Sequence, residues 1–535
     1  MKPSKQCINS LFIAVVFLGL TSCRSTDTDE ALKAGGLASV NVNLLGADYS
    51  DAESNARQAS VKSNISTANN EIQRYTEMLT PSSFIESELA PVSLASNAQA
   101  SIGNNAIAAV SGSALGTNVK FRIIAYQQAN GAYKDHKDYT IGQQGPSLLL
   151  DRSVTYYLVI YSWGTNSLPA ITSSELNNIN NAAIAYNNTN KDFLYQKVTY
   201  TTTNEKGNVS TTLRHKMSEI TVTLNSVGGS MSSVSNAVLG PHYASGNISL
   251  SNGAIARTGS SSNINLSFPA GTSTSKTSSA VVLNADTGNS NSGVFSANIT
   301  MDGTTKTLNL GNTFKINPEK QQKLTINIRK CGAVINGLFR DFACQNLGAT
   351  PGINPFSAVA GNHGAKYQWG RLNPALIQVD DQNPIYNNGV QWSTSIAPDN
   401  GWNAGVESKP VKSATDPCPS GYRVPTGAEL SALYFSNKSN IKLIGTWSNN
   451  VTNYTSGAMI GDKLFLPAAG YRLDLNGSLR NRGDNGSYWS STPYSGSYAY
   501  NLGINGTNIL PDSWFNRAAA FSVRCISQNY DYLYK

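Results

Sequence analysis

The fold of this chain is decided by two stretches, NVKFRIIAYQ at residues 118–127 and VTYYLVIYSW at residues 154–163. Both are short runs rich in β-branched and aromatic residues, which is typical of buried strands. Further runs of this kind follow at about ten-residue spacing, with turn residues between them: 147–151, 220–227, 247–252, 263–269, 279–285, 293–301 and 323–330. Such spacing predicts β-sandwiches. The number of strands favours two sandwiches, with a break near residues 187–200.

An earlier strand is predicted from ASVNVNLLGA at residues 38–47. Val40, Val42 and Leu44 alternate with Asn41 and Asn43, the period-two pattern of a half-buried strand. Residues 48–70 follow and are poor in large apolar groups. Stretches of that length without predicted structure are uncommon in compact domains and are often functional.

The N-terminus has the layout of a secretory signal. Lys2 and Lys5 precede an apolar segment, residues 11–20, that is too short to span a bilayer. The sequence Leu-Thr-Ser-Cys ending at Cys23 resembles a bacterial lipobox. This resemblance implies removal of residues 1–22 and lipidation of Cys23, which would hold the mature protein on the outer membrane at the cell surface. An ordinary signal peptide that happens to precede a cysteine is the alternative.

Residues 23–36 are expected to form a polar tether. The acidic residues of this tether resemble the export signal of surface lipoproteins; they are Asp27, Asp29 and Glu30. A solvent-exposed linker without a signal function would have the same composition.

The composition is that of an extracellular β-protein. Charged residues make up only 13% of the 535 residues, whereas the chain contains 45 glycines and 25 tyrosines. The formal net charge of +8 is not gathered into a Lys/Arg cluster, which argues against nucleic acid as a partner.

Several blocks in the first 330 residues resemble those of fimbrillin-like proteins, the subunits of pili assembled from lipoprotein precursors. They are VKFRIIAYQQANGAYKDHKDYTIG, TYYLVIYSWG, LRHKMSEITVTLNS and LGPHYASGNISLSNGAI. The resemblance implies two tandem transthyretin-like β-sandwiches, which we expect at residues 37–195 and 196–330.

The same resemblance implies assembly with other pilus subunits by strand exchange. An arginine-specific protease would cut after the first strand, and a partner's strand would then replace Val40, Val42 and Leu44. Arg57 is the first candidate for the cut and Arg74 is the second, with solvated loop arginines as the alternative for both.

Residues 331–535 resemble the FISUMP (major paralogous) domain, a relative of the C-type-lectin-like fold. The blocks that carry this resemblance are KCGAVINGLFRDFACQNLGA, HGAKYQWGR, DPCPSGYRVPTGAEL, DKLFLPAAGYR, GSYWSSTP and NRAAAFSVRCI. It implies an α+β domain with a disulfide between Cys418 and Cys525, which leaves Cys331 and Cys344 as a second pair in an oxidising compartment. A reduced, buried pair is the alternative for these last two cysteines.

Within this region, Thr426 and Glu429 are spaced as the capping box of a helix. We expect Trp489 to be buried, and we take Tyr494, Tyr498 and Trp514 as the candidates for binding a glycan or a host protein. The Arg-Gly-Asp tripeptide that begins at Arg482 is common by chance and is not assigned a role.

Enzyme motifs are lacking in the sequence. The four histidines are widely separated, without metal-binding spacing, and neither a nucleophile elbow nor a phosphate loop occurs. We therefore expect no enzymatic activity, no cofactor and no metal.

These inferences predict a cell-surface pilus subunit. A position at the pilus tip is expected because little chain follows the SVRCI strand before Lys535, too little to donate a strand. The alternative is a non-polymerising outer-membrane lipoprotein that binds glycans or host proteins, and a purely structural spacer is a third hypothesis.

Overall fold

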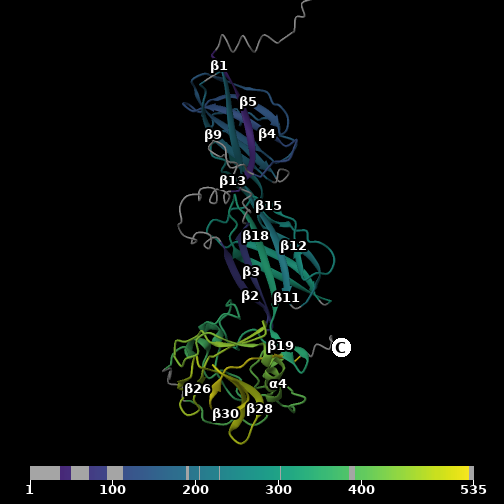
Figure 1. The fold of residues 1–535 in the computed structure, drawn as a ribbon, viewed down its shortest axis with the longest axis vertical. Helices are drawn as coiled ribbons and strands as arrows, with labels where there is room; N and C mark the ends of the chain where they lie inside the picture. Colours follow the sequence, from purple (N-terminus) through teal and green to yellow (C-terminus); the bar gives the residue numbers. More distant parts are fainter. Residues whose placement is uncertain are drawn as a thin grey trace, which may run out of the picture.

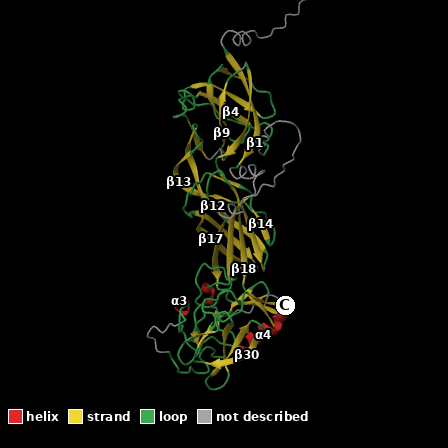
Figure 2. Cartoon of the chain, turned by 60° about the vertical axis from the view of Figure 1, so that its left-hand side comes forward, coloured by secondary structure: helices red, strands yellow, loops and turns green. Residues whose placement is uncertain are grey.

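Three β-rich domains follow one another along the long axis of the molecule (Figure 1). The computed structural model describes residues 36–49, 72–92, 113–187, 192–203, 205–227, 229–301, 303–384 and 392–528. Strands predominate in the N-terminal and middle domains, whereas the C-terminal domain combines short strands with many loops, and it contains the helices of the described residues (Figure 2). The mainly β fold predicted from the sequence is confirmed.

The N-terminal domain is one mixed seven-stranded sheet in the order β5-β4-β7-β9-β10-β1-β6. Its strands are β1 (Leu37–Asp48), β4 (Lys120–Gln127), β5 (Tyr133–Thr140), β6 (Leu148–Asp151), β7 (Thr155–Ser162), β9 (Leu194–Thr201) and β10 (Lys206–His215). One apolar core contains residues from all seven strands, so the sheet curls around it. Both faces of β4 are buried. Neighbouring residues of a strand point to opposite faces, so Ile123 lies in this core and Ile124 lies in a second one.

That second core joins the N-terminal domain to the middle domain. It combines Val159 and Trp163 of the N-terminal domain with Ile248 and Leu250 of the middle domain. In addition, β8 (Ala183–Asn187) pairs with β12 (Met231–Ser249). The two domains therefore share buried apolar surface, and β8, which lies between β7 and β9 in the sequence, joins a sheet of the middle domain.

The middle domain is a sandwich of two sheets. One sheet contains β2 (Gln73–Thr80), β3 (Ser83–Pro91), β11 (Ser218–Val227), β14 (Ser275–Thr277), β15 (Val281–Leu283) and β18 (Gln321–Lys330). The other contains β8, β12, β13 (Ile255–Asn265), β16 (Gly293–Met301) and β17 (Thr304–Phe314). Ile85, Val222 and Ile326 of the first sheet pack with Leu239 and Phe295 of the second in a single core.

The pairing of these strands corrects the expected domain boundaries. Residues 37–195 were expected in one sandwich and residues 196–330 in the next. Instead, β2 and β3 belong to the middle domain, where β3 pairs with β18, and β10 belongs to the N-terminal domain, where it pairs with β1. Apolar alternation predicts that a segment is a half-buried strand, but it carries no information about which sheet the strand joins.

The C-terminal domain follows β18 directly. It contains β19 (Gly332–Ile335), β20 (Leu338–Asp341), η2 (Ala360–His363), β21 (Tyr367–Gln368), α3 (Gln378–Asp381), β22 (Tyr422–Arg423), α4 (Gly427–Asn437), η3 (Lys438–Asn440), β23 (Ile441–Ile444), β24 (Gly457–Ile460), β25 (Leu464–Pro467), β26 (Tyr471–Arg472), β27 (Leu479–Arg480), β28 (Asn485–Pro493), β29 (Tyr498–Asn505), β30 (Ile509–Asn516), β31 (Ala520–Phe521) and β32 (Ile526–Ser527). The predicted capping box of α4 is confirmed, because the Thr426 hydroxyl accepts from the Glu429 amide and the Glu429 carboxylate accepts from the Thr426 amide. Trp489 is fully buried, as predicted.

The C-terminal domain binds the tip of the β2–β3 hairpin through a set of hydrogen bonds, here called the clasp. The Cys331 amide donates to the Ser82 carbonyl and the Cys344 amide donates to the Pro81 carbonyl, both at 2.7 Å. The Ser82 and Tyr422 hydroxyls lie 2.7 Å apart. A hairpin from the first hundred residues therefore connects the middle and C-terminal domains.

Candidate functional site

The predicted exchange strand, β1, lies inside the sheet of the N-terminal domain (Figure 1). It runs parallel to β10 from Ser39 to Asp48 and antiparallel to β6 from Leu37 to Val40. Its two ladders are unequal, since the one to β6 spans only four residues. Along most of its length β1 is therefore held by β10 on one edge.

The apolar side chains of β1 point into the core of this domain. Val40 is fully buried, and Val42 and Leu44 are partly buried and pack against the same core. Asn41 and Asn43 are exposed. The predicted alternation is thus confirmed.

Polar contacts hold both ends of β1. The Arg152 guanidinium donates to the Leu37 carbonyl at 3.0 Å, and the Asp48 carboxylate accepts from the Ser113 amide at 3.2 Å. Just beyond the strand, the Tyr49 ring stacks on His215 with ring centroids 3.9 Å apart. Burial raises the pKa of the Tyr49 hydroxyl, which therefore stays protonated at physiological pH.

The predicted modification and cleavage residues are only partly covered by the structure. Cys23 and Arg57 lie outside the described residues. Arg74 is the second residue of β2, where its exposed guanidinium pairs with Glu88 of β3 at 2.9 Å. Arg74 therefore lies within a paired strand rather than in a loop.

Both expected disulfides are formed. Cys331–Cys344 closes a short loop at the junction of the middle and C-terminal domains, and Cys418–Cys525 joins residues 107 positions apart in the C-terminal domain. Each sulfur pair is buried.

The predicted ligand-binding aromatics, Tyr494, Tyr498 and Trp514, lie together on the surface of the C-terminal domain. Tyr494 follows β28, Tyr498 begins β29 and Trp514 lies in β30. The Tyr494 and Trp514 rings are parallel within 3° at a centroid separation of 5.4 Å, and Tyr498 meets Trp514 edge-on at 5.2 Å. These three side chains are 46%, 39% and 50% exposed. Tyr500, which pairs across the strands with Trp514, completes the cluster and was not among the predicted residues.

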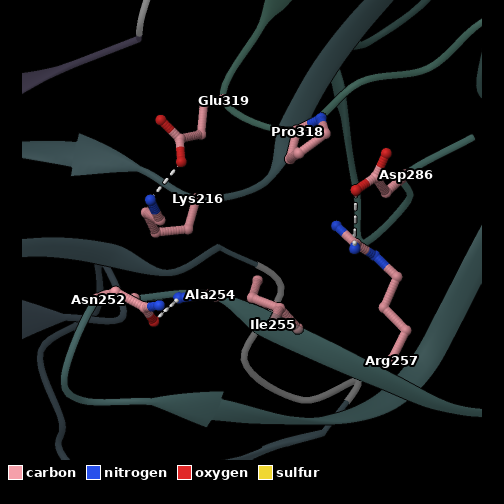
Figure 3. Close-up of a pocket in the computed structure, with 9 residues that line it drawn as sticks. Lys216, Asn252, Ala254, Ile255, Arg257, Asp286, Pro318 and Glu319 are labelled. Atoms are coloured by element: carbon pink, nitrogen blue, oxygen red, sulfur yellow. Dashed lines mark hydrogen bonds and ion pairs between the residues drawn. The ribbon is translucent and has the colours of Figure 1, made fainter. Parts of the chain in front are cut away.

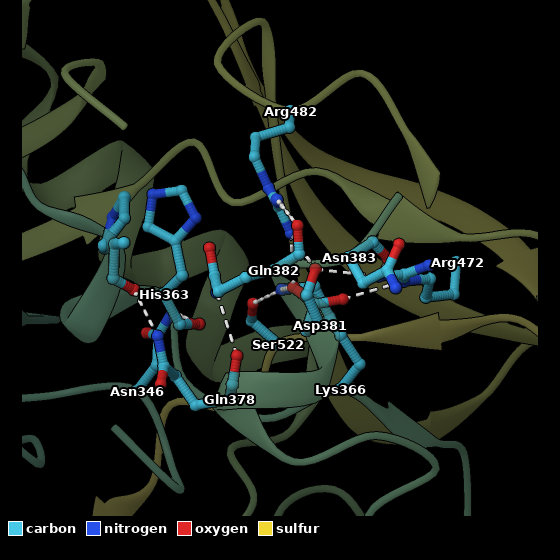
Figure 4. Close-up of polar contacts among 12 residues, drawn as sticks. Asn346, His363, Lys366, Gln378, Asp381, Gln382, Asn383, Arg472, Arg482 and Ser522 are labelled. Atoms are coloured by element: carbon cyan, nitrogen blue, oxygen red, sulfur yellow. Dashed lines mark hydrogen bonds and ion pairs between the residues drawn. The ribbon is translucent and has the colours of Figure 1, made fainter. Parts of the chain in front are cut away.

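The same domain contains a buried ionic network that was not predicted from the sequence (Figure 4). Asp381 at the end of α3 receives hydrogen bonds from Arg472 and Arg482, each at 2.8 Å, and its carboxylate lies 3.4 Å from the Lys366 ammonium. All four side chains are fully buried. Burial lowers the pKa of Lys366 to about 8, although Asp381 opposes this change.

His363 adjoins this network and is itself buried, and neither ring nitrogen has a hydrogen-bond partner among the residues that the structure describes. Burial, followed by the charges of Lys366 and Arg482, lowers the pKa of His363 well below its usual value, which keeps the ring neutral. Arg482 is also the first residue of the Arg-Gly-Asp tripeptide, and its burial makes this side chain inaccessible to a partner.

A cavity of about 360 Å³ lies where the N-terminal and middle domains meet (Figure 3). Lys216 pairs there with Glu319, and Arg257 lies 3.5 Å from Asp286. Burial lowers the pKa of Arg257. Each cation that lines this cavity thus has an acidic neighbour, and the charges of the cavity wall are balanced.

Within the described residues, no three His, Cys, Asp or Glu side chains are grouped so as to hold a metal ion. In the same residues, no helix combines the length and the apolar character that crossing a membrane would require.

Comparison with known proteins identifies one family. The model of the fimbrillin-like family matches residues 104–339, which agrees with the resemblance seen in the sequence for that part of the chain. No match was found among curated proteins. The FISUMP resemblance of residues 331–535 stays a prediction.

Solved structures with similarity to this chain include two candidate cell adhesion proteins and a fimbrial anchor protein. A candidate cell adhesion protein from Parabacteroides distasonis is 10% identical, with 45% of this chain and 87% of that chain covered and a TM-score of 0.30. A candidate cell adhesion protein from Bacteroides fragilis is 12% identical, with 42% and 83% covered and a TM-score of 0.28. The fimbrial anchor protein Mfa2 from Porphyromonas gingivalis is 10% identical, with 42% and 92% covered and a TM-score of 0.26.

Proposed function

We propose that this chain, whose residues 104–339 are fimbrillin-like, is a fimbrial adhesin of the cell surface that assembles by exchanging β1 for a strand of a partner subunit. It would reach the outer membrane as a lipoprotein anchored through Cys23. The observation that carries the proposal is the position of β1: a strand from the start of the chain, embedded in a sheet built otherwise from residues 120–215.

Removing β1 would leave a groove that favours the binding of a new strand. The backbone of β10 would lose its parallel ladder, and the core residues Val209 and Leu213 of β10 would lose Val42 and Ala47, their neighbours in the register with β1. Unpaired strand edges and uncovered apolar side chains both favour the addition of another strand. The incoming strand would need apolar residues at the alternate positions now held by β1.

The position of the β2–β3 hairpin favours Arg57 as the site of the cut. Because this hairpin belongs to the middle domain, a cut between β1 and β2 would separate β1 from the rest of the protein and leave the middle domain intact. Arg57 is the only arginine in residues 50–71, between the two strands. A cut at Arg74 would instead fall within β2, whose backbone is paired with β3.

The proposal is tested by purifying surface filaments from cells that make the protein and identifying their subunits by mass spectrometry. We expect the wild-type chain and Arg74→Ala to be present in the filaments and Arg57→Ala to remain in the outer-membrane fraction. Equal incorporation of all three chains would exclude cleavage at Arg57, and the absence of the wild-type chain from filaments would exclude the fimbrial role.

We further propose that the C-terminal domain is the adhesive head and that the protein occupies the pilus tip. The C-terminal domain lies at the end of the molecule opposite the strand that would be exchanged (Figure 1), so the head would project away from a partner bound at the β1 groove. The exposed aromatic cluster also supports the alternative, a lipoprotein that binds its ligand without polymerising. Retention of the lipid on Cys23 in all surface-exposed material would favour that alternative.

A further inference from the structure

We propose that Tyr494, Tyr498, Tyr500 and Trp514, here called the aromatic platform, bind a neutral oligosaccharide by stacking sugar rings on their exposed faces. This inference rests on the proposed function, because it assigns a ligand class to the adhesive head. It depends on the geometry, the rigidity, the charge and the size of the platform.

The platform offers ring faces to solvent at fixed angles. Trp514 and Tyr494 stack with parallel rings, and Tyr498 meets Trp514 edge-on. The Tyr500 ring meets Tyr494 edge-on at a centroid separation of 5.0 Å. The face of an aromatic ring carries partial negative charge, which attracts the weakly positive C–H groups on the apolar face of a pyranose. A tyrosine hydroxyl can in addition donate a hydrogen bond to a sugar hydroxyl or accept one from it.

Backbone contacts hold the platform in place before a ligand arrives. The Tyr494 amide donates to the Tyr498 carbonyl at 3.0 Å, which closes the turn between β28 and β29. The buried Arg517 guanidinium donates to the same carbonyl at 3.0 Å, and it also pairs with Asp399 at 2.6 Å. A ligand would therefore meet rings whose backbone is already ordered, which lowers the entropic cost of binding.

The charge around the platform selects against anionic ligands. Asp512 is the only charged residue in residues 485–516, and it is exposed two positions before Trp514. A carboxylate beside the rings repels phosphate, sulphate and sialic acid groups, but it accepts hydrogen bonds from sugar hydroxyls. Arg517, which follows this stretch in the sequence, is already paired with Asp399.

The size of the platform fits a few sugar rings better than a folded protein. An aromatic side chain offers about 150–250 Å² of surface, so three side chains that are roughly half exposed present about 300 Å². A stable protein interface covers about 800 Å² on each partner. The platform alone is therefore too small for a protein partner and comparable to a short oligosaccharide.

The test uses the full-length protein and immobilised neutral hexasaccharides of glucose, mannose, galactose and N-acetylglucosamine, with sialylated and sulphated oligosaccharides as the anionic set. We expect binding to at least one neutral hexasaccharide, at least a tenfold loss of affinity for Trp514→Ala and less than a threefold change for Trp514→Phe. Phe435→Ala is the matched control, since Phe435 is an exposed aromatic of the same domain that lies in α4. Because stacking needs no metal, a chelator should leave binding unchanged.

The proposal is overturned if no neutral hexasaccharide binds, if only the anionic set binds, or if Trp514→Ala binds as tightly as the wild type. Circular dichroism of each variant shows whether it is folded. If Trp514→Ala is unfolded, the test passes to Tyr494→Ala and Tyr498→Ala, which must be folded and must lose at least tenfold in affinity. Filament incorporation of Trp514→Ala is measured separately and should equal that of the wild type. Failure of sugar binding is thereby distinguished from failure of the fimbrial role.

Discussion

At the scale of single residues, the strongest constraint is the carboxylate of Asp381, which is buried among Lys366, Arg472 and Arg482. Asp381→Asn would leave three buried cations without their counter-ion, and we expect it to lower the free energy of unfolding by about 3–5 kcal/mol. Glu88→Gln is the control, because its carboxylate also pairs with an arginine, Arg74, but both side chains are exposed, and it should cost less than about 1 kcal/mol. Denaturant titration measures the free energy of unfolding of both variants. An equal decrease in the two would contradict this account of the network.

Lys366 in the same network makes the free energy of unfolding depend on pH, in a direction that follows from its lowered pKa. Burial lowers its pKa to about 8 in the folded protein, whereas the unfolded chain has the ordinary value of 10.5. Between these two values the unfolded state binds more protons, so the contribution of Lys366 to stability rises with pH and is constant below about pH 8. Compared with Lys366→Met, the wild type should gain about 2 kcal/mol between pH 7 and about pH 9.5. Parallel curves for the two proteins would show that the lysine is not buried as a cation.

At the scale of elements, β3 of the β2–β3 hairpin is the segment whose role is least evident from its place in the chain. Ile85 and Leu89 of β3 are buried in the core of the middle domain, and β3 pairs with β18 along its whole length. We expect Ile85→Ala to destabilise the middle domain by about 2–5 kcal/mol. Leu79→Ala in β2, at a position 37% exposed, should cost less than about 1 kcal/mol. Hydrogen exchange of β11 and β18 reports on this domain, and unchanged protection in Ile85→Ala would contradict the assignment.

The elements that could be predicted from sequence are those specified by local patterns. Val40, Val42 and Leu44 mark β1 by alternation, and Thr426 with Glu429 marks the start of α4. The hairpin at residues 73–91 was missed, although the alternation of Ile85, Ser87 and Leu89 was a usable signal. Its pairing with a strand more than 200 residues away has no local signature. The ionic network around Asp381 could not be predicted for the same reason. Asp381 of α3, Arg472 of β26 and Arg482 are far apart in the sequence and follow no spacing rule.

At the scale of the whole molecule, the clasp on the hairpin tip fixes the C-terminal domain to the middle domain. The loop closed by Cys331–Cys344 supplies both amides that bind Pro81 and Ser82. We expect the double variant Cys331→Ser/Cys344→Ser to accelerate hydrogen exchange in residues 80–84 and 329–344, while β11 keeps its protection. The matched control is Cys418→Ser/Cys525→Ser, which should affect the C-terminal domain and leave β2 and β3 unchanged. Faster exchange throughout the middle domain in the first variant would show that this disulfide supports the sandwich rather than the clasp.

The account as a whole depends on β1 being exchanged when the protein assembles. The most direct measurement is the N-terminal sequence of the chain recovered from purified surface filaments. The account predicts a terminus at Gln58, directly after Arg57, and no peptide from residues 37–48 in the filament. Filaments whose subunits still begin at Cys23 and retain β1 in the sheet would contradict it.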